Sequence, residues 1–199
     1  MSKPIRVVFL GLLALTSIGL GLWFGNKASA PDPASGYTHM GGDFTLQSAT
    51  GPVSLADYRG KVVAIYFGYT HCPDVCPTSL AALAQAFNRL SDEERAQMRG
   101  IFISVDPERD TPEIATKYAQ AFHPSFSGLS GTPEAIAEVA KRYFVLYEKV
   151  EMDDSAMEYA IDHSSILYVL GKNGIVQSLV RHSESQEDLL KSLRAALAG

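Results

Sequence analysis

The chain has only two cysteines, Cys72 and Cys76, among its 199 residues. A scaffold held together by disulfides would need four or more cysteines at dispersed spacings, so this class of protein is excluded. The sequence also lacks low-complexity tracts and internal repeats. Apolar residues make up 46% of it, enough for one well-filled core. A single close pair of cysteines therefore indicates redox chemistry or metal binding in an ordinary globular domain.

Basic residues are scarce beyond the first 30 positions. Lys3, Arg6 and Lys27 are three of the 17 basic residues, and all 22 acidic residues lie further along the chain. From position 31 onward, the chain has 14 basic and 22 acidic residues, a formal charge of -8. Nucleic-acid binding requires a basic surface, so we expect no nucleic-acid partner.

Charged residues are also absent from a run of 19 residues at positions 7–25. A transmembrane helix needs about 20 such residues, whereas the apolar region of a signal peptide has about 7–15. We therefore expect a retained membrane anchor at 7–25, after a cytoplasmic stub at 1–6 whose Lys3 and Arg6 set its orientation. The alternative is a removed signal peptide, because residues 28–30 (Ala-Ser-Ala) resemble a cleavage site. Pro31, directly after them, is a poor context for a peptidase.

Residues 26–42 are rich in Gly, Pro, Ser and Ala, which predicts a linker between the anchor and a domain at 43–199. Both interpretations of the amino-terminal run place this domain outside the cytoplasm. The simplest setting is a bacterial inner membrane, crossed once, with the domain in the periplasm.

Strand and helix patterns alternate along the domain, in the order hairpin, strand, helix, strand, helix, short strand, helix, hairpin, helix. Strand–helix–strand units require parallel pairing, and the closing hairpin adds an antiparallel edge. We therefore predict a thioredoxin-like α/β fold, a mixed sheet flanked by helices. The main expected strands are 43–47, 53–55, 61–68, 100–105, 166–170 and 175–180, and the expected helices are 77–90 and those that begin after the capping residues Ser91, Thr111, Thr132 and Ser185.

The two cysteines lie between the expected strand 61–68 and the helix that follows it. Ligands bind at this edge of open α/β sheets, and a helix amino terminus favours thiolate. Four positions separate Cys72 from Cys76, about one helical turn, so both sulfurs can face one point. The spacing is compatible with a disulfide, with sulfurs about 2.05 Å apart. It is equally compatible with two thiolates on one metal, roughly 4 Å apart.

Two thiolates rarely complete a metal site, so a third ligand is sought among the five histidines. His39 lies in the linker, and His123 and His182 are expected at the surface. His71 adjoins Cys72, where its side chain is expected to point away from the sulfurs and could instead lower a thiol pKa.

His163 is the best candidate for the third ligand. It precedes the expected strand 166–170, and in a thioredoxin-like fold this loop approaches the cysteine loop, although a structural role fits the position equally well. Two thiolates and one imidazole suit the soft ion Cu(I). Structural zinc would require a fourth ligand, which Asp162 or Asp74 could supply, so zinc stays open on chemistry alone.

Three motifs together resemble the Sco/SenC family. They are FGYTHCPDVCP at 67–77, SVDPERDTP at 104–112 and DHS at 162–164. The order and separation of the motifs also resemble the family, and the likeness extends from about residue 40 to 198.

The resemblance implies a thioredoxin-like fold and a copper site made by Cys72, Cys76 and His163, holding Cu(I) and, as a further state, Cu(II). It implies a partner, the cytochrome c oxidase subunit with the binuclear copper centre, alongside other periplasmic copper or thiol-redox proteins. Asp106 enters only as part of the second motif, where capping the turn before the next helix would explain it equally well. Four residues are expected around the ligands: Asp74, Asp162, Asp106 and His71.

Two functions remain open, and a third is disfavoured. The first is a copper chaperone, a transfer protein rather than an enzyme. The second is a thiol-disulfide oxidoreductase that reduces the cysteines of a partner's copper site. A thiol peroxidase would need threonine three residues before a cysteine, where this chain has Tyr69 and Pro73. His163 separates the first two, because a three-ligand copper site needs it and thiol exchange does not.

Overall fold

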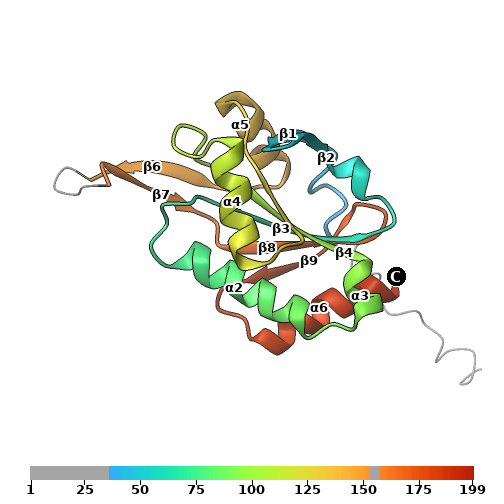
Figure 1. Ribbon diagram of the computed structural model, residues 1–199. Coiled ribbons are helices and arrows are strands. Elements are labelled where there is room, and N and C mark those ends of the chain that lie inside the picture. The colour runs from blue at the N-terminus through green and yellow to red at the C-terminus, as the bar shows by residue number, and fades with distance from the viewer. Residues whose placement is uncertain (1–35, 153–156) are drawn as a thin grey trace, which may run out of the picture. The chain divides into compact units, whose positions relative to one another are not determined.

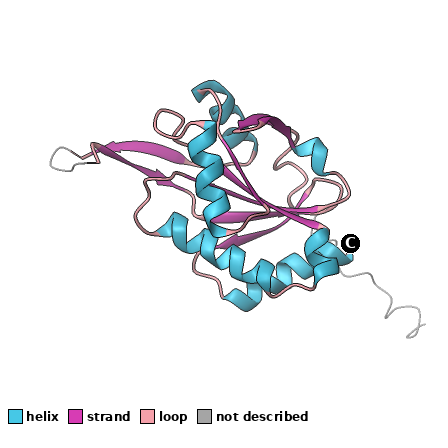
Figure 2. Ribbon diagram, viewed as in Figure 1, coloured by secondary structure: helices cyan, strands magenta, loops and turns pink. Residues whose placement is uncertain are grey.

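A five-stranded mixed sheet forms the centre of the fold, in the order β5-β4-β3-β8-β9 (Figures 1 and 2). The computed structural model describes residues 36–152 and 157–199, which belong to one unit, Pro33–Gly199. Within the sheet, β3 pairs in parallel with β4, and β4 with β5, while β8 pairs antiparallel with both β3 and β9. The predicted thioredoxin-like α/β arrangement is therefore confirmed.

The elements follow the predicted order, with one additional hairpin. The strands are β1 (Thr45–Ser48), β2 (Gly51–Ser54), β3 (Val62–Gly68), β4 (Met98–Ser104), β5 (Phe126–Leu129), β6 (Tyr147–Glu151), β7 (Tyr159–His163), β8 (Ile166–Leu170) and β9 (Val176–Arg181). The helices are the 3-10 helix η2 (Leu55–Tyr58), α2 (Val75–Asn88), α3 (Asp92–Ala96), α4 (Pro112–Phe122), α5 (Pro133–Arg142) and α6 (Gln186–Ala198). The hairpin β6–β7 was not predicted.

Local sequence signals explain where the helices begin. Thr111 and Thr132 each accept a hydrogen bond from a first-turn amide, and a proline follows each of them at the first helical position. Ser91 and Glu94 form the expected capping box of α3. These caps end the preceding loops at fixed points.

Both faces of the sheet are covered by helices. Alternation along β3 sends Phe67 to one face, where it packs on Tyr143 just after α5. Tyr66 and Gly68 face the other way, toward Cys76 on α2. On that side α2 lies against both α4 and α6. All seven residues of β3 are buried, which fits its nearly unbroken apolar sequence.

The hairpin β6–β7 forms a separate two-stranded sheet and extends away from the central one (Figure 1). Its sequence is mostly polar, and four of the five residues of β6 are exposed. In β7, Tyr159 and Ile161 are buried while Asp162 is exposed, so alternation identifies this strand better than hydropathy does.

The predicted anchor at 7–25 and most of the predicted linker lie outside the described residues and stay predictions. In the part of the chain that is described, no helix is both long enough and apolar enough to cross a membrane.

Candidate metal centre

The two cysteines lie where β3 leads into α2. Cys76 is the second residue of the helix and is fully buried, and Cys72 is 8% exposed in the preceding loop. Asp74 makes no side-chain capping bond at the start of α2; instead, the Cys76 amide donates to the sulfur of Cys72 at 3.5 Å. Both thiols are free. A sulfur therefore takes the place that a capping oxygen usually occupies.

His163 reaches these thiols from the end of β7. Its Nε2 lies 3.2 Å from the sulfur of Cys76. The ligand atoms of Cys72, Cys76 and His163 all lie within 4.8 Å of one another, and within residues 36–152 and 157–199 this is the one such group of three or more. The structure therefore brings together the three residues that the sequence suggested, with 87 positions between Cys76 and His163.

The imidazole of His163 is oriented for metal binding. Its Nδ1 lies 3.3 Å from the carbonyl oxygen of Ser164, and since a carbonyl only accepts, this contact places the proton on Nδ1. Nε2 then has a free lone pair toward the sulfurs. Burial lowers the pKa of His163, which favours the neutral form that binds metals. Tyr66 and Tyr69 pack edge-to-face on the ring, with centroids 6.1 and 5.8 Å away.

The thiol of Cys76 differs from the expectation for a helix amino terminus. Burial raises its pKa, and a hydrogen bond from the Tyr69 backbone lowers the pKa by less. Cys76 is therefore a protonated thiol at neutral pH in the metal-free protein. A metal that binds there must displace a proton, so its apparent affinity rises with pH.

Gly68 at the end of β3 makes room for the sulfur of Cys76. A Cβ atom at this position would lie 2.7 Å from that sulfur and 2.9 Å from the ring of Tyr66. Only glycine allows the strand to pass so close to the thiol. The site therefore depends on a residue that supplies no ligand.

Asp110 anchors the loop that carries Cys72. Its side chain is fully buried and accepts hydrogen bonds from the Thr70 amide at 2.9 Å and the Thr70 hydroxyl at 2.5 Å. The Ser104 hydroxyl donates to the same carboxylate at 2.6 Å. Thr70 stands two residues before Cys72, so Asp110 fixes the approach of the loop to the helix. No local sequence signal distinguishes Asp110 as a support of the site.

The four residues expected around the ligands have different roles. Asp74 and Asp162 are exposed, and neither joins the group of three, so no carboxylate completes a tetrahedron there. The side chain of His71 is 51% exposed and contacts Thr70 and Asp110 rather than a sulfur. Asp106 is buried, and its carboxylate accepts from Tyr159 and Arg109 rather than capping a turn.

The surface beside His163 is open and partly apolar. An open hollow of about 500 Å³ is lined by six residues: Leu146, Tyr147, Glu148, Asp162, His163 and Ser164. The Leu146 residue is 78% exposed. Glu148 and Asp162 stand directly opposite each other on β6 and β7, a like-charge pair that destabilises the hairpin.

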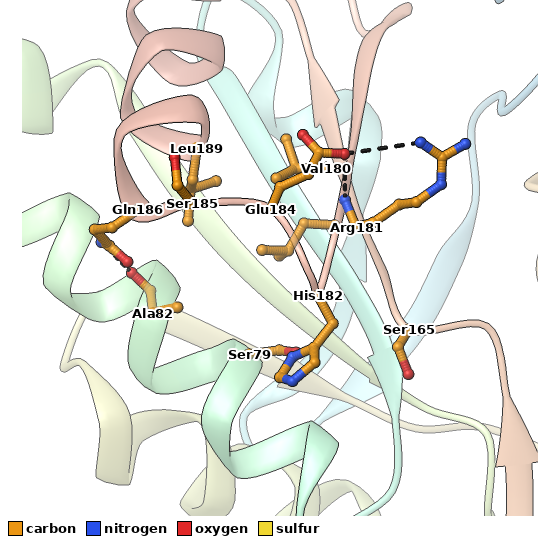
Figure 3. Close-up of a pocket in the computed structure, with 11 residues that line it drawn as sticks. Ser79, Ala82, Ser165, Val180, Arg181, His182, Glu184, Ser185, Gln186 and Leu189 are labelled. Carbon is orange, nitrogen blue, oxygen red and sulfur yellow. Dashed lines mark hydrogen bonds and ion pairs between the residues drawn. The ribbon is translucent and has the colours of Figure 1, made fainter.

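Two further histidines lie away from the site. The expectation of a surface position is wrong for His123, which is buried against the rings of Phe87 and Phe126. His182 is exposed as predicted, and its ring points at Ser79 on α2, 3.0 Å away, beside a small cavity of about 30 Å³ (Figure 3). That cavity has room for about one or two water molecules.

A thiol pair at the junction of a strand and a helix, with an imidazole against it, defines a thioredoxin-like protein able to hold a soft metal ion. The SCO1/SenC family model matches residues 32–198. The chain belongs to this family, as the three sequence motifs suggested.

Relatives and solved structures agree with this assignment. The chain is 38% identical to the mouse (Mus musculus) protein named "Protein SCO2 homolog, mitochondrial" over 159 residues, which cover 79% of this chain and 62% of the mouse protein. It therefore spans less than two thirds of the length of that relative.

Two solved structures are informative about the site. Arabidopsis thaliana ScoI, described with copper bound, has a TM-score of 0.74 and 36% identity, and the match covers 80% of this chain and 98% of the other. BsSco, described as having a disulfide switch and as a member of the Sco family of cytochrome c oxidase assembly proteins, has a TM-score of 0.62 and 26% identity. That match covers 81% of this chain and 94% of BsSco.

Proposed function

We propose that the protein is a copper chaperone that binds copper through Cys72, Cys76 and His163. The copper is cargo, delivered to the binuclear copper centre of cytochrome c oxidase. The single observation that supports this best is the position of His163, whose Nε2 lies 3.2 Å from the sulfur of Cys76. A protein that only exchanged disulfides would have no use for a neutral imidazole in that place.

The donor set favours copper over zinc. Two sulfurs and one imidazole match the soft ligands and low coordination number of Cu(I), and the absence of a carboxylate from the described group argues against a closed tetrahedral zinc site. The imidazole also offers the harder donor that Cu(II) prefers. Asp74, Asp162, Asp106 and His71 stay predictions as residues around the ligands, and none of them belongs to the group of three ligand residues.

The proposed setting is the periplasmic side of a bacterial inner membrane. Residues 7–25 would anchor the protein, and residues 26–42 would link the anchor to the domain at 43–199. The partner that receives copper would be the oxidase subunit with the binuclear centre, and other periplasmic copper or thiol-redox proteins would load or reduce the site.

Anaerobic titration tests copper binding. The reduced full-length chain in detergent micelles should take up one equivalent of Cu(I), and the disulfide form should take up none, because oxidation consumes both sulfurs. Cys72→Ser and Cys76→Ser should each abolish tight binding, since a hydroxyl is a poor ligand for Cu(I). Undiminished binding by the oxidised chain would place the copper elsewhere.

The second candidate function is a thiol-disulfide oxidoreductase that reduces the cysteines of the same copper site. It is favoured by the two free thiols in a thioredoxin-like fold. His163→Ala separates the two functions because it removes the imidazole and leaves both sulfurs. A chaperone with this change should lose Cu(II) binding and, at limiting copper, fail to support oxidase assembly; added copper should restore part of the activity.

His182→Ala is the matched control for that experiment. It removes an exposed histidine that contacts Ser79 and lies away from the three ligands. It should support normal oxidase assembly. If His163→Ala also supports normal assembly at limiting copper while Cys72→Ser does not, the protein is a reductant and the chaperone proposal fails.

A further inference from the structure

His163 lies on a strand outside the central sheet. Its strand, β7, pairs only with β6 among the described strands, and neither strand pairs with the central sheet. The cysteines, by contrast, follow directly from the central strand β3. On its carboxyl side, the histidine segment is held by β8, which begins three residues after His163 and pairs with β3. On its amino side no backbone pairing ties β7 to the central sheet, so side chains must hold it there.

Asp106 provides the first of these side-chain links. It lies two residues beyond the end of β4, and it is only 3% exposed. Its carboxylate accepts a hydrogen bond from the hydroxyl of Tyr159 at 2.8 Å and another from Nε of Arg109 at 2.5 Å. Tyr159 is the first residue of β7, four positions before His163. The sheet thus holds the start of the histidine strand through one buried carboxylate.

Arg109 provides a second link to the same strand. Its Nη1 donates to the carbonyl oxygens of Met157 at 3.2 Å and Tyr159 at 3.1 Å. Its guanidinium also stacks over the ring of Tyr159, 3.6 Å from the centroid. On the other side it lies 5.7 Å from the ring centre of Tyr69, the residue whose ring packs on His163.

We propose that Arg109, held by Asp106, is a positioning residue that keeps His163 against the two thiols. Arg109 donates hydrogen bonds to the start of β7 and also contacts the ring of Tyr69. The Tyr69 ring in turn packs on the imidazole from the cysteine side. The one segment that follows β4 therefore contacts both halves of the metal site. The relevance to copper depends on the proposed function, but the positioning itself does not.

A purely structural role for Arg109 would have different consequences. A buried ion pair adds little net stability relative to apolar residues of the same size, because both charges lose their hydration. Nη2 of Arg109 is moreover buried with no hydrogen-bond partner in the part of the chain that the structure describes, which adds a further cost. The contacts of Arg109 therefore fix a geometry more than they stabilise the fold.

NMR of the metal-free chain tests the proposal without copper. The full-length protein in detergent micelles, uniformly isotope-labelled, reports the His163 ring protons, whose shifts depend on the neighbouring rings of Tyr66 and Tyr69. Arg109→Met should move these signals toward those of an unpacked histidine. The amide signal of Thr70, which Asp110 holds, should stay in place.

Lys149→Met is the matched control. Lys149 is the other cation over the ring of Tyr159, at 3.9 Å, but its ammonium pairs with Glu108 and makes no hydrogen bond to β7. This change should leave the His163 signals where they are. Unmoved His163 signals in Arg109→Met, or equal shifts in both variants, would overturn the proposal.

Tyr159→Phe and Arg109→Lys keep the proposal testable if Arg109→Met fails to fold. Tyr159→Phe removes only the hydroxyl that Asp106 accepts, and it should shift the His163 signals in the same direction by a smaller amount. Arg109→Lys keeps the charge but loses the paired geometry, so it should restore the signals only in part. Wild-type signals in Tyr159→Phe and in Arg109→Lys would again contradict the role.

Copper binding gives a separate readout. Loss of a residue that orients a ligand typically lowers metal affinity about 10–100-fold, and we expect Arg109→Met to weaken Cu(II) binding by that factor while the thiol-disulfide potential stays unchanged. If the wild-type chain binds no copper, the proposed function fails and the NMR result still decides the positioning. If wild-type and Arg109→Met bind Cu(II) equally and with the same nitrogen ligation, the positioning proposal fails alone.

Discussion

The two halves of the metal site are built in different ways. The cysteine half follows a fully buried central strand, and Asp110 holds its loop with two hydrogen bonds from Thr70 and is itself tied to β4 by a third from Ser104. The histidine half stands on a two-stranded hairpin that is largely exposed and contains a like-charge pair. The thiols therefore have a rigid support, whereas the imidazole is held by β8 on its carboxyl side and by a few side-chain contacts on its amino side.

Asp110→Ala should break the rigid half and have the largest effect. It leaves the Thr70 amide and hydroxyl and the Ser104 hydroxyl without their buried acceptor, and each orphaned group costs about 1–3 kcal/mol. The free energy of unfolding, measured with urea, should fall by a few kcal/mol, the sum of these costs. The copper affinity should fall as well. Asp110→Asn, which retains one acceptor oxygen, should lose less. Equal losses in both variants would contradict the anchoring role.

Gly68→Ala should damage the thiols while leaving the hairpin intact. The added methyl group would lie 2.7 Å from the sulfur of Cys76, so the helix or the strand must shift. Overpacking of this kind costs about 1–3 kcal/mol. Gly36→Ala is a suitable control, because nothing lies within 4 Å of its Cβ position. Cu(I) affinity should fall in the first variant and stay constant in the second, and a normal affinity in both would show that the sulfur needs no such room.

Acid should destabilise the folded protein through His123. Burial lowers its pKa, so the folded protein favours the neutral ring. The unfolded chain binds a proton below the ordinary histidine pKa of about 6.5, so this contribution is present above that pH and is lost as the pH falls. His123→Gln should flatten the dependence of unfolding free energy on pH below about 6.5. An unchanged slope would mean that other groups cause the acid sensitivity.

Glu148→Thr should stabilise the hairpin slightly. It removes one member of the pair that faces Asp162 across β6 and β7, and such pairs are worth roughly 0.2–1 kcal/mol. Hydrogen exchange of the β6 and β7 amides should become slower, with no change in β3. Glu151→Thr is the control, since Glu151 faces Tyr159 rather than an acid. Equal slowing in the two variants would assign the effect to strand propensity alone.

The central sheet and the cysteine site could be predicted from the sequence because their signals are local. Apolar runs gave β3 and β4, Thr-Pro pairs gave the starts of α4 and α5, and the position of the cysteines after β3 gave one edge of the site. The identity of the third ligand needed the family resemblance, since spacing alone left His163 compatible with a structural role.

The support around the site was not predicted because it depends on long-range pairing. Asp110 meets Thr70 only because β3 and β4 run parallel with Gly68 beside Ser104. No local pattern announces a contact that spans 40 positions. The hairpin β6–β7 was missed for another reason: its polar strands lack an apolar run, and only the alternation of Tyr159 and Ile161 indicates a strand.

The hydrogen bonds of Asp110 have a thermodynamic consequence for loading and release. They join protein groups to one another and involve none of the three ligand atoms, so the cysteine loop owes its conformation to the chain itself. Small zinc domains are the opposite case, because they unfold when the metal leaves. Here metal exchange should cause little change in buried apolar area, and the heat capacity of copper binding, measured by calorimetry at several temperatures, should be close to zero.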